Sequence, residues 1–229
     1  MKLRVAPIAL LVVLAGCGST KTSSIPSSSG TTTAATTRGE PTAKAPAGCT
    51  TVKQVAPKPD GKLKKPVSKL DTSKTWTATV TTNCGTFAFK LDTKNAPNAS
   101  ASIDYLAGKK FFDKTTFHRI VPGFVIQGGD PTGSGTGGPG YSTVDTPPKN
   151  TNYTKGVVAM AKTGDEPAGT AGSQFFVVTG ANANLPPDYA AVGKVTSGQD
   201  VVDRIGKLGD SAQQPTTTVE IQSFTVRSS

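Results

Sequence analysis

Short segments of alternating or β-branched apolar residues, separated by turn residues, recur along residues 75–229 and constrain the fold more than any other feature. The first two, 76–81 and 87–91, flank a turn at 83–85, so they predict a β-hairpin. Strands dominate the pattern, which predicts a mainly β fold. The remaining predicted strands are 115–121, 124–128, 156–160, 174–179, 191–195 and, with a bulge, 219–226.

Two helical patterns interrupt these strands and lie far apart in the chain. The first opens at residues 95–98, where Pro suits a first turn and Asn can cap, and it ends at Gly108. The second fits residues 199–205. Because strand and helix do not alternate, the pattern favours an antiparallel sheet, closed so that it has no free edges.

The basic residues are concentrated outside this predicted domain. Of the formal net charge of +10, residues 38–74 carry +6, from nine Lys and Arg against three Asp and Glu. Residues 75–229 hold thirteen against twelve, a net of +1. A nucleic-acid-binding domain places its positive charge on the folded face that meets phosphate. The distribution therefore argues against a nucleic-acid partner.

Residues 1–16 have the pattern of an export signal, a charged start followed by an apolar core that is too short to span a bilayer as a mature helix. Residues 14–17, Leu-Ala-Gly-Cys, resemble the bacterial lipobox, in which the Cys is acylated on sulfur and becomes the first residue. This resemblance implies that Cys17 anchors the protein to the extracytoplasmic face of the cell membrane. An ordinary secretory signal with an incidental Cys is the alternative.

Two segments connect this signal to the predicted domain. Residues 17–48, rich in Ser, Thr, Ala, Gly and Pro, cannot bury enough surface to offset the entropy of ordering, so they predict a flexible tether. Residues 49–74 are rich in Lys and Pro and predict a basic extended arm. Its lysines either meet anionic headgroups, at about 1 kcal/mol per Lys near the surface, or are merely solvated.

Two cysteines remain besides Cys17, at positions 49 and 84. An even pair in an exported protein predicts a disulfide. A bond between Cys49 and Cys84 would pin the arm to the turn of the first hairpin, and the chain-entropy description gives it up to about 4 kcal/mol of stability. Two free thiols are the alternative.

Residues 117–131 read Phe-His-Arg-Ile-Val-Pro-Gly-Phe-Val-Ile-Gln-Gly-Gly-Asp-Pro, two short strands around a Pro-Gly turn. This string and Gly-Ser-Gln-Phe-Phe at 172–176 resemble the signatures of the cyclophilins, a family of peptidyl-prolyl cis-trans isomerases. The resemblance covers residues 75–227. It implies an eight-stranded antiparallel closed barrel capped by two helices, with the active groove on its outer wall.

The resemblance also assigns roles to residues of the groove. It implies that Arg119 faces the prolyl carbonyl and nitrogen, that Gln127 orients Arg119, and that Phe124 belongs to the same catalytic set. By the same resemblance, Phe124 shares the proline pocket with Val125, Phe176 and Leu185. The backbone of Ala161 and Lys162 anchors the substrate. Gln174 lines the groove, and Asn184 and Tyr189 stand at its rim. Turning an amide requires no acid–base residue, metal or cofactor, and none is predicted.

Two other motifs suggest different chemistry but are better explained as structural. Residues 133–138 have the glycine spacing of a dinucleotide-binding loop, yet Pro139 and Gly140 follow where that loop needs a helix, so a surface loop is predicted. His118 is the only histidine, and no ligands are spaced to complete a zinc site around it. It is therefore interpreted as a packed or hydrogen-bonded strand residue.

The groove departs from the family pattern at several positions. Asn184 stands where many cyclophilins have Trp, Tyr189 where they have His, Val125 where they have Met, and Lys162 where they have Asn. The loop 163–172 is also longer than usual. Since the family's Trp donates to cyclosporin, Asn184 predicts cyclosporin binding that is weaker by roughly ten- to thirtyfold.

The predicted function is a lipid-anchored, monomeric peptidyl-prolyl cis-trans isomerase that acts on proline-containing exported polypeptides. A chaperone or assembly factor that holds such segments, with incidental turnover, is the alternative. Arg119 favours catalysis, because binding alone does not need a group matched to a twisted amide. A solute-binding lipoprotein is a weaker hypothesis, since those proteins are usually larger and two-lobed.

Overall fold

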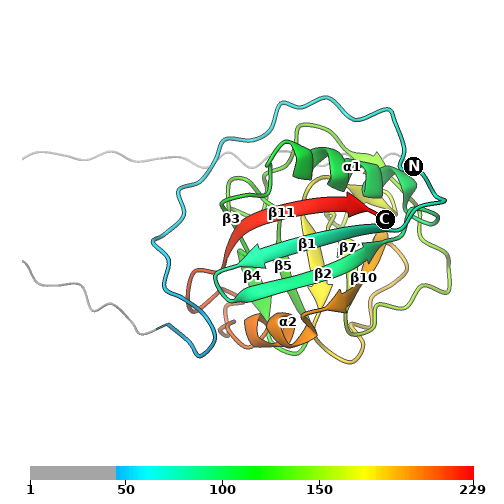
Figure 1. Cartoon of the computed structure of the whole chain (residues 1–229). Coiled ribbons are helices and arrows are strands. Elements are labelled where there is room, and N and C mark those ends of the chain that lie inside the picture. The colour runs from blue at the N-terminus through cyan, green and yellow to red at the C-terminus, as the bar shows by residue number, and fades with distance from the viewer. Residues whose placement is uncertain (1–44) are drawn as a thin grey trace, which may run out of the picture. The chain divides into compact units, whose positions relative to one another are not determined.

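The computed structural model describes residues 45–229, and the predicted mainly β fold with two helices is confirmed (Figure 1). The signal peptide predicted for residues 1–16, Cys17, and the tether as far as residue 44 lie outside the described residues. The elements are β1 Trp76–Thr82, β2 Gly85–Leu91, α1 Pro97–Gly108, β3 Thr115–Thr116, β4 Arg119–Val121, β5 Val125–Gly128, β6 Thr143–Val144, β7 Val157–Met160, β8 Thr170–Ala171, β9 Phe175–Val178, β10 Ala191–Ser197, α2 Gln199–Ile205 and β11 Glu220–Ser228.

Nine strands form one antiparallel sheet in the order β3-β11-β1-β2-β10-β7-β9-β5-β4, and β6 pairs with β8 separately. The two edge strands, β3 and β4, are separated along the chain by only Phe117 and His118. The sheet therefore curls until its two edges meet at one bent segment of the chain. The sequence predicted a single strand over 115–121 and eight strands in all. The bend divides that strand because its partner changes from β11 to β5.

Side chains fill the interior of the curled sheet. Val80 of β1 and Phe87 and Phe89 of β2 are fully buried, and they alternate with more exposed neighbours along each strand. The rings of Phe112 and Phe224 lie 4.5 Å apart in the same core. Because the inside is packed, a groove for a peptide has to lie on the outer wall.

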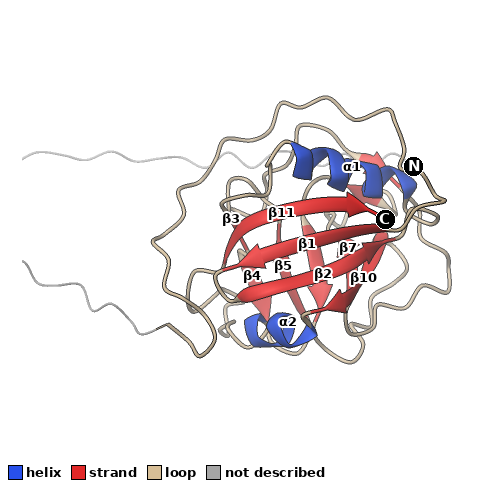
Figure 2. Ribbon diagram, in the orientation of Figure 1, coloured by secondary structure: helices blue, strands red, loops and turns tan. Residues whose placement is uncertain are grey.

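The helices α1 and α2 lie at opposite ends of the sheet (Figure 2). The sequence predicted an Asn cap for α1, but the cap residue is Ala96 and no side chain of its own turn caps the helix. Instead, Asp145 accepts the N–H groups of Asn98 at 3.2 Å and Ala99 at 2.6 Å. A distant carboxylate thus replaces the local cap and complements the helix dipole. Within residues 45–229, neither helix is long and apolar enough to cross a membrane.

The arm, residues 49–74, contains neither helix nor strand, and it follows the surface of the domain past α1 on its way to β1 (Figure 1). Leu63 and Leu70 pack against the main core. The ammonium group of Lys58 donates to two carbonyl oxygens of the segment after α1. The arm is therefore docked along the domain and belongs to the same compact unit.

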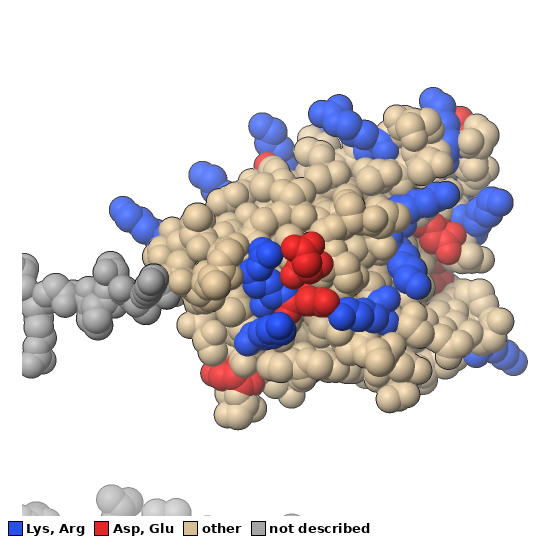
Figure 3. Space-filling view, turned by 60° about the horizontal axis from the view of Figure 1, so that its bottom comes forward, with Lys and Arg blue, Asp and Glu red and all other residues tan. Residues whose placement is uncertain are grey.

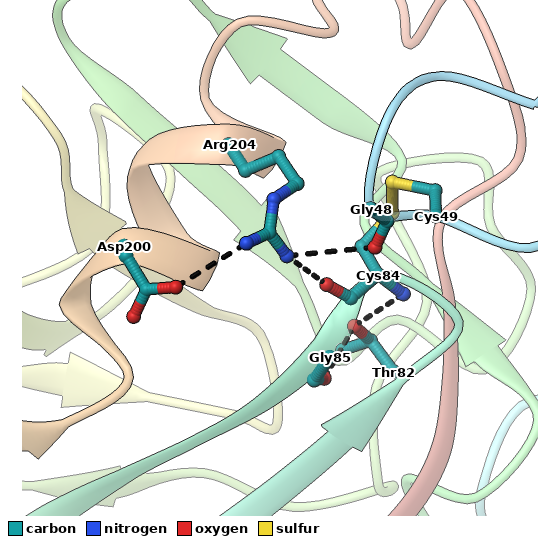
Figure 4. A network of polar contacts seen from close by, with 7 residues as sticks. All are labelled: Gly48, Cys49, Thr82, Cys84, Gly85, Asp200 and Arg204. Carbon is teal, nitrogen blue, oxygen red and sulfur yellow. Dashed lines mark hydrogen bonds and ion pairs between the residues drawn. A yellow bond between two sulfur atoms is a disulfide. The ribbon is translucent and has the colours of Figure 1, made fainter.

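The predicted disulfide between Cys49 and Cys84 is present and joins the start of the arm to the turn between β1 and β2 (Figure 4). Arg204 of α2 supports this junction, because its Nη1 donates to the carbonyl oxygen of Cys84 at 2.6 Å. Its Nη2 forms an ion pair with Asp200 at 3.2 Å, one helical turn earlier. With both sulfur atoms bonded, the alternative of two free thiols does not apply.

Candidate active site

The strand register brings the main predicted site residues side by side. Arg119 of β4 is directly opposite Gln127 of β5, and Gln127 is directly opposite Phe176 of β9. Directly opposed residues on neighbouring strands place their side chains on the same face of a sheet. The tight turn before β5 contains Gly123, whose φ of 72° is readily adopted by glycine. The hairpin turn and the ladder together fix the spacing of the three side chains.

A chain of hydrogen bonds holds the Arg119 guanidinium in place. Nη1 donates to Gln127 Oε1 at 3.3 Å, and Gln127 Nε2 donates to Gln174 Oε1 at 3.0 Å. Gln174 Nε2 in turn donates to the carbonyl oxygens of Gly135 at 2.9 Å and Gly137 at 3.0 Å. The side-chain oxygen and nitrogen of both Gln127 and Gln174 are hydrogen-bonded, so the chain of bonds connects the Arg119 guanidinium to the glycine-rich loop.

Gln213, which the sequence did not single out, forms the second support of the same cation. Its Oε1 accepts the Nε–H of Arg119 at 2.8 Å, while its backbone oxygen accepts the N–H of Ile120 at 3.0 Å. Gln213 has a left-handed φ of 64° in the segment between α2 and β11. No sequence pattern marks this position, because only the fold brings it to β4.

A cavity of about 290 Å³ opens beside Arg119, and nine of the eleven predicted groove residues line it. Gln174 lies outside this lining, and its side chain is hydrogen-bonded to Gln127, which belongs to the lining. Asn184 is also outside: it is exposed, with a left-handed φ of 51°, and its N–H is held by Asn182. The lining consists of Arg119, Phe124, Val125, Gln127, Ala161, Lys162, Phe176, Leu185 and Tyr189.

An aromatic cluster supports one wall of this cavity. Tyr153 is only 1% exposed, and its ring centroid lies 6.0 Å from that of Tyr189, which lies 5.6 Å from that of Phe176. The Tyr153 hydroxyl donates to the backbone oxygen of Tyr189 at 2.6 Å and accepts its N–H at 3.0 Å. No sequence pattern singled out Tyr153, so its role as a support for Tyr189 was missed.

The pair Ala161 and Lys162, predicted to anchor the substrate backbone, is partly engaged within the protein. The N–H of Ala161 donates to the backbone oxygen of Gln174 at 2.9 Å, so it is not free for a ligand. The ammonium group of Lys162 turns back to its own loop, where it donates to the backbone oxygens of Thr163 and Glu166 at 3.0 Å. It also lies 5.6 Å from the centroid of the Tyr189 ring, a cation–π distance.

The glycine-rich loop 133–138 is organised around a carboxylate of the protein. Asp130 accepts the N–H groups of Thr132 at 2.7 Å, Gly135 at 2.6 Å and Gly137 at 3.2 Å. Burial opposes ionisation of Asp130, but the hydrogen bonds from the Thr132 hydroxyl and from these three N–H groups outweigh it and hold the pKa of its carboxyl below the ordinary value. The amides that a dinucleotide phosphate would need are thus already occupied, which agrees with the predicted surface loop.

His118 packs beside this loop, and neither of its ring nitrogens has a hydrogen-bond partner within the described part of the chain. Burial is the main reason that the pKa of His118 is lowered. The negative charge of Asp130 raises this pKa in part, whereas the positive charge of Arg119 lowers it further. The ring is therefore neutral at physiological pH. Among residues 45–229, no three His, Cys, Asp or Glu side chains are grouped so that they would hold a metal ion.

Charges of both signs are mixed on the face of the domain that carries α2. Figure 3 shows Lys and Arg among Asp and Glu on this face, without one continuous positive surface. Lys155 and Asp203, for example, form an ion pair at 2.7 Å. This face therefore does not present the single-sign surface that binding along a phosphate backbone requires.

Comparisons with known proteins agree with the geometry. The sequence model of the family described as "Cyclophilin type peptidyl-prolyl cis-trans isomerase/CLD" matches residues 77–226. The chain is 43% identical over 111 residues to peptidyl-prolyl cis-trans isomerase B of Bacillus subtilis, which covers 48% of this chain and 76% of that protein. It is 39% identical over 147 residues to the peptidyl-prolyl cis-trans isomerase of Helicobacter pylori, and this match covers 63% of this chain and 88% of that protein.

Solved structures give the same result for the fold. The crystal structure of a cyclophilin-type peptidyl-prolyl cis-trans isomerase of Cryptosporidium parvum is similar with a TM-score of 0.63 and 29% sequence identity. The match covers 68% of this chain and 99% of that one. A second crystal structure of the same protein, determined in the presence of the dipeptide Ala-Pro, has a TM-score of 0.62.

Proposed function

The chain belongs to the cyclophilin-type peptidyl-prolyl cis-trans isomerases, and we propose that the cavity beside Arg119 is where it turns the X-Pro bonds of exported polypeptides. The observation that carries this proposal is the hydrogen-bond chain from Arg119 through Gln127 to Gln174, which holds a cation beside the apolar side chains of the same cavity. Exported substrates follow from the signal sequence predicted for residues 1–16.

Catalysis of this reaction means stabilising a twisted amide. Rotation about the peptide bond has a barrier of about 18–20 kcal/mol because amide resonance is lost on the way. In the twisted state the prolyl nitrogen becomes pyramidal and basic. The Arg119 guanidinium carries a positive charge and donates in a plane, so it interacts more strongly with the twisted amide than with the planar one. Each 1.36 kcal/mol of that difference is a tenfold gain in rate.

The rest of the cavity positions the proline and its peptide. Phe124, Phe176 and Leu185 offer the proline ring apolar contacts, and a ring bound there would displace water and so strengthen the interaction of the amide with Arg119. Because the Ala161 N–H is already bonded to Gln174, anchoring of the substrate backbone falls to the neighbouring Lys162 amide. No step moves a proton, so the groove needs no acid or base.

The test of this proposal is the replacement of Arg119. Arg119→Ala is expected to lower kcat/KM by about 100-fold, as loss of a donor to a transition state commonly does, and Arg119→Lys to restore little because an ammonium lacks the planar fork. Exchange NMR on an X-Pro peptide measures both. Arg227→Ala is the matched control, since Arg227 is exposed on β11. Near-normal turnover by a folded Arg119→Ala variant would contradict the assigned role.

The proposed location is the extracytoplasmic face of the cell membrane, with Cys17 as the lipidated residue. The lipobox at residues 14–17 supports this location, and the tether predicted for residues 17–48 would give the domain reach from the surface. A single acyl chain holds a protein only marginally, whereas more than one gives stable anchoring. We propose that the protein works there as a monomer.

Weak cyclosporin binding is proposed for the same groove. The apolar side chains of the lining, Leu185 among them, could contact a large apolar ligand. The neighbouring residue, Asn184, stands where the family's Trp would donate to cyclosporin, and it offers less apolar surface and a shorter donor. Affinity is therefore expected to be lower than that of cyclophilins with Trp.

A further inference from the structure

The docked arm touches the loop that supports the active site. Between Lys58 and Leu63 the arm runs beside residues 131–139 and donates three backbone hydrogen bonds to them. The N–H of Lys58 donates to Pro131 at 2.8 Å, and the N–H of Leu63 donates to Pro139 at 2.9 Å. Between these two contacts, the carbonyl of Gly138 accepts the N–H of Gly61 at 2.9 Å.

One peptide unit of this loop connects the arm to the active site. The peptide between Gly137 and Gly138 accepts Gln174 Nε2 on its carbonyl oxygen at 3.0 Å and donates its N–H to Asp60 Oδ1 at 3.0 Å. A peptide unit is rigid and planar, so fixing its N–H also fixes its carbonyl. Because glycine on both sides allows the backbone to rotate, the two hydrogen bonds contribute to fixing the orientation of this plane.

The arm approaches this loop more closely than a side chain would allow. A Cβ atom placed on Gly61 would lie 2.7 Å from the Cα of Pro139, and one on Gly140 would lie 2.5 Å from the carbonyl oxygen of Gly61. Real Cβ atoms do not approach backbone atoms to this distance. Gly61 and Gly140 are therefore required for the contact that brings Asp60 to Gly138.

We propose that Asp60 and Gly61 of the arm are positioning residues for the isomerase reaction. Asp60 orients the Gly137–Gly138 peptide, this peptide holds Gln174, and Gln174 holds Gln127 and thereby Arg119. The arm is thus part of the scaffold of the active site as well as a connection to the tether. This inference rests on the proposed catalytic role of Arg119.

The expected effect of losing the Asp60 contact falls on kcat. Arg119 acts in the twisted state, so an imperfectly oriented guanidinium lowers kcat and kcat/KM together and leaves KM nearly unchanged. Asp60 is exposed, so water replaces part of its hydrogen bond. We expect Asp60→Ala to lower kcat about three- to fivefold, and Asp60→Asn, whose oxygen still accepts, to restore most of it.

The experiment compares Asp60→Ala and Asp60→Asn with Asp71→Ala in the full chain, by exchange NMR on an X-Pro peptide. Asp71 is the matched control, an arm aspartate whose carboxylate, within the described residues 45–229, bonds only to Ser73 two positions later. The side-chain amide resonance of Gln174 is recorded for each variant, well below its melting temperature. In Asp60→Ala this resonance is expected to move, whereas in Asp71→Ala it should stay in place.

Gly61→Ala provides a second, independent disruption, with Gly108→Ala as its control because a Cβ at Gly108 meets nothing within 4 Å. We expect Gly61→Ala to shift the Gln174 resonance and to lower kcat, whereas Gly108→Ala should do neither. An unmoved Gln174 resonance in both Asp60→Ala and Gly61→Ala overturns the inference, even if stability falls. Since that resonance is independent of turnover, it tests the arm separately from the role of Arg119.

Discussion

Tyr153→Phe is the perturbation whose consequence can be worked out most fully from the structure. It removes one oxygen atom that both donates to the backbone oxygen of Tyr189 and accepts its N–H, at 2.6 Å and 3.0 Å. The ring, which is 1% exposed, keeps its packing. Two backbone groups of Tyr189 lose their partner, which at about 1 kcal/mol each lowers the free energy of unfolding by about 2 kcal/mol. For a domain of this size, the melting temperature should fall by about 4–8 °C.

The same variant should change how stability depends on pH. Burial raises the pKa of Tyr153 to about 12, whereas the phenol of the unfolded chain ionises near pH 10. The stability that comes from this raised pKa is fully present below pH 10 and is lost as the pH rises from 10 through 12. Tyr153→Phe lacks that group, so the difference between wild type and variant should narrow by about 1 kcal/mol between pH 7.5 and pH 10.5.

Urea denaturation at pH 7.5, 9 and 10.5 measures both effects, because groups common to the two proteins cancel in the difference. Tyr105→Phe is the control: Tyr105 is partly buried against the core, and no hydrogen bond of its hydroxyl is found within residues 45–229. A Tyr153→Phe variant as stable as wild type at pH 7.5 would refute the hydrogen-bond reasoning. A difference that widens with rising pH would refute the ionisation reasoning.

Three further predictions concern the anchor, the arm and the rim of the groove. Cys17→Ser should release the protein from membranes without changing its isomerase activity, and a variant that still sediments with membranes after a high-salt wash would contradict lipidation. Replacing Cys49 and Cys84 together by Ser should lower the free energy of unfolding by up to about 4 kcal/mol, measured by urea denaturation; an unchanged midpoint would show that the docked arm does not need the disulfide. Asn184→Trp should tighten cyclosporin binding roughly ten- to thirtyfold, as measured by titration beside wild type, and equal affinities would place residue 184 away from the ligand.

Local sequence patterns determined most of the strands and helices. The alternation around the turn at 83–85 predicted the β1–β2 hairpin, because one face of each strand has to be buried. Nine of the eleven groove residues predicted by resemblance line one cavity. Arg119, Val125, Gln127 and Phe176 lie on paired strands, whereas the other five lie in the turns and loops beside them. The disulfide between Cys49 and Cys84 was also predicted correctly.

Only the tertiary structure decided the contacts between segments that are far apart in the chain. Gln213 reaches Arg119 across 94 positions, and Asp145 caps α1 from 46 positions away. The arm was predicted to be extended, but its docking depends on backbone hydrogen bonds that any residue can make and on the close approach that Gly61 permits. Such contacts leave no periodic pattern in the sequence, because they depend on where the folded sheet brings each segment. The sequence by itself therefore determined most of the strands and the residue types that line the groove, and the fold decided what holds those residues in place.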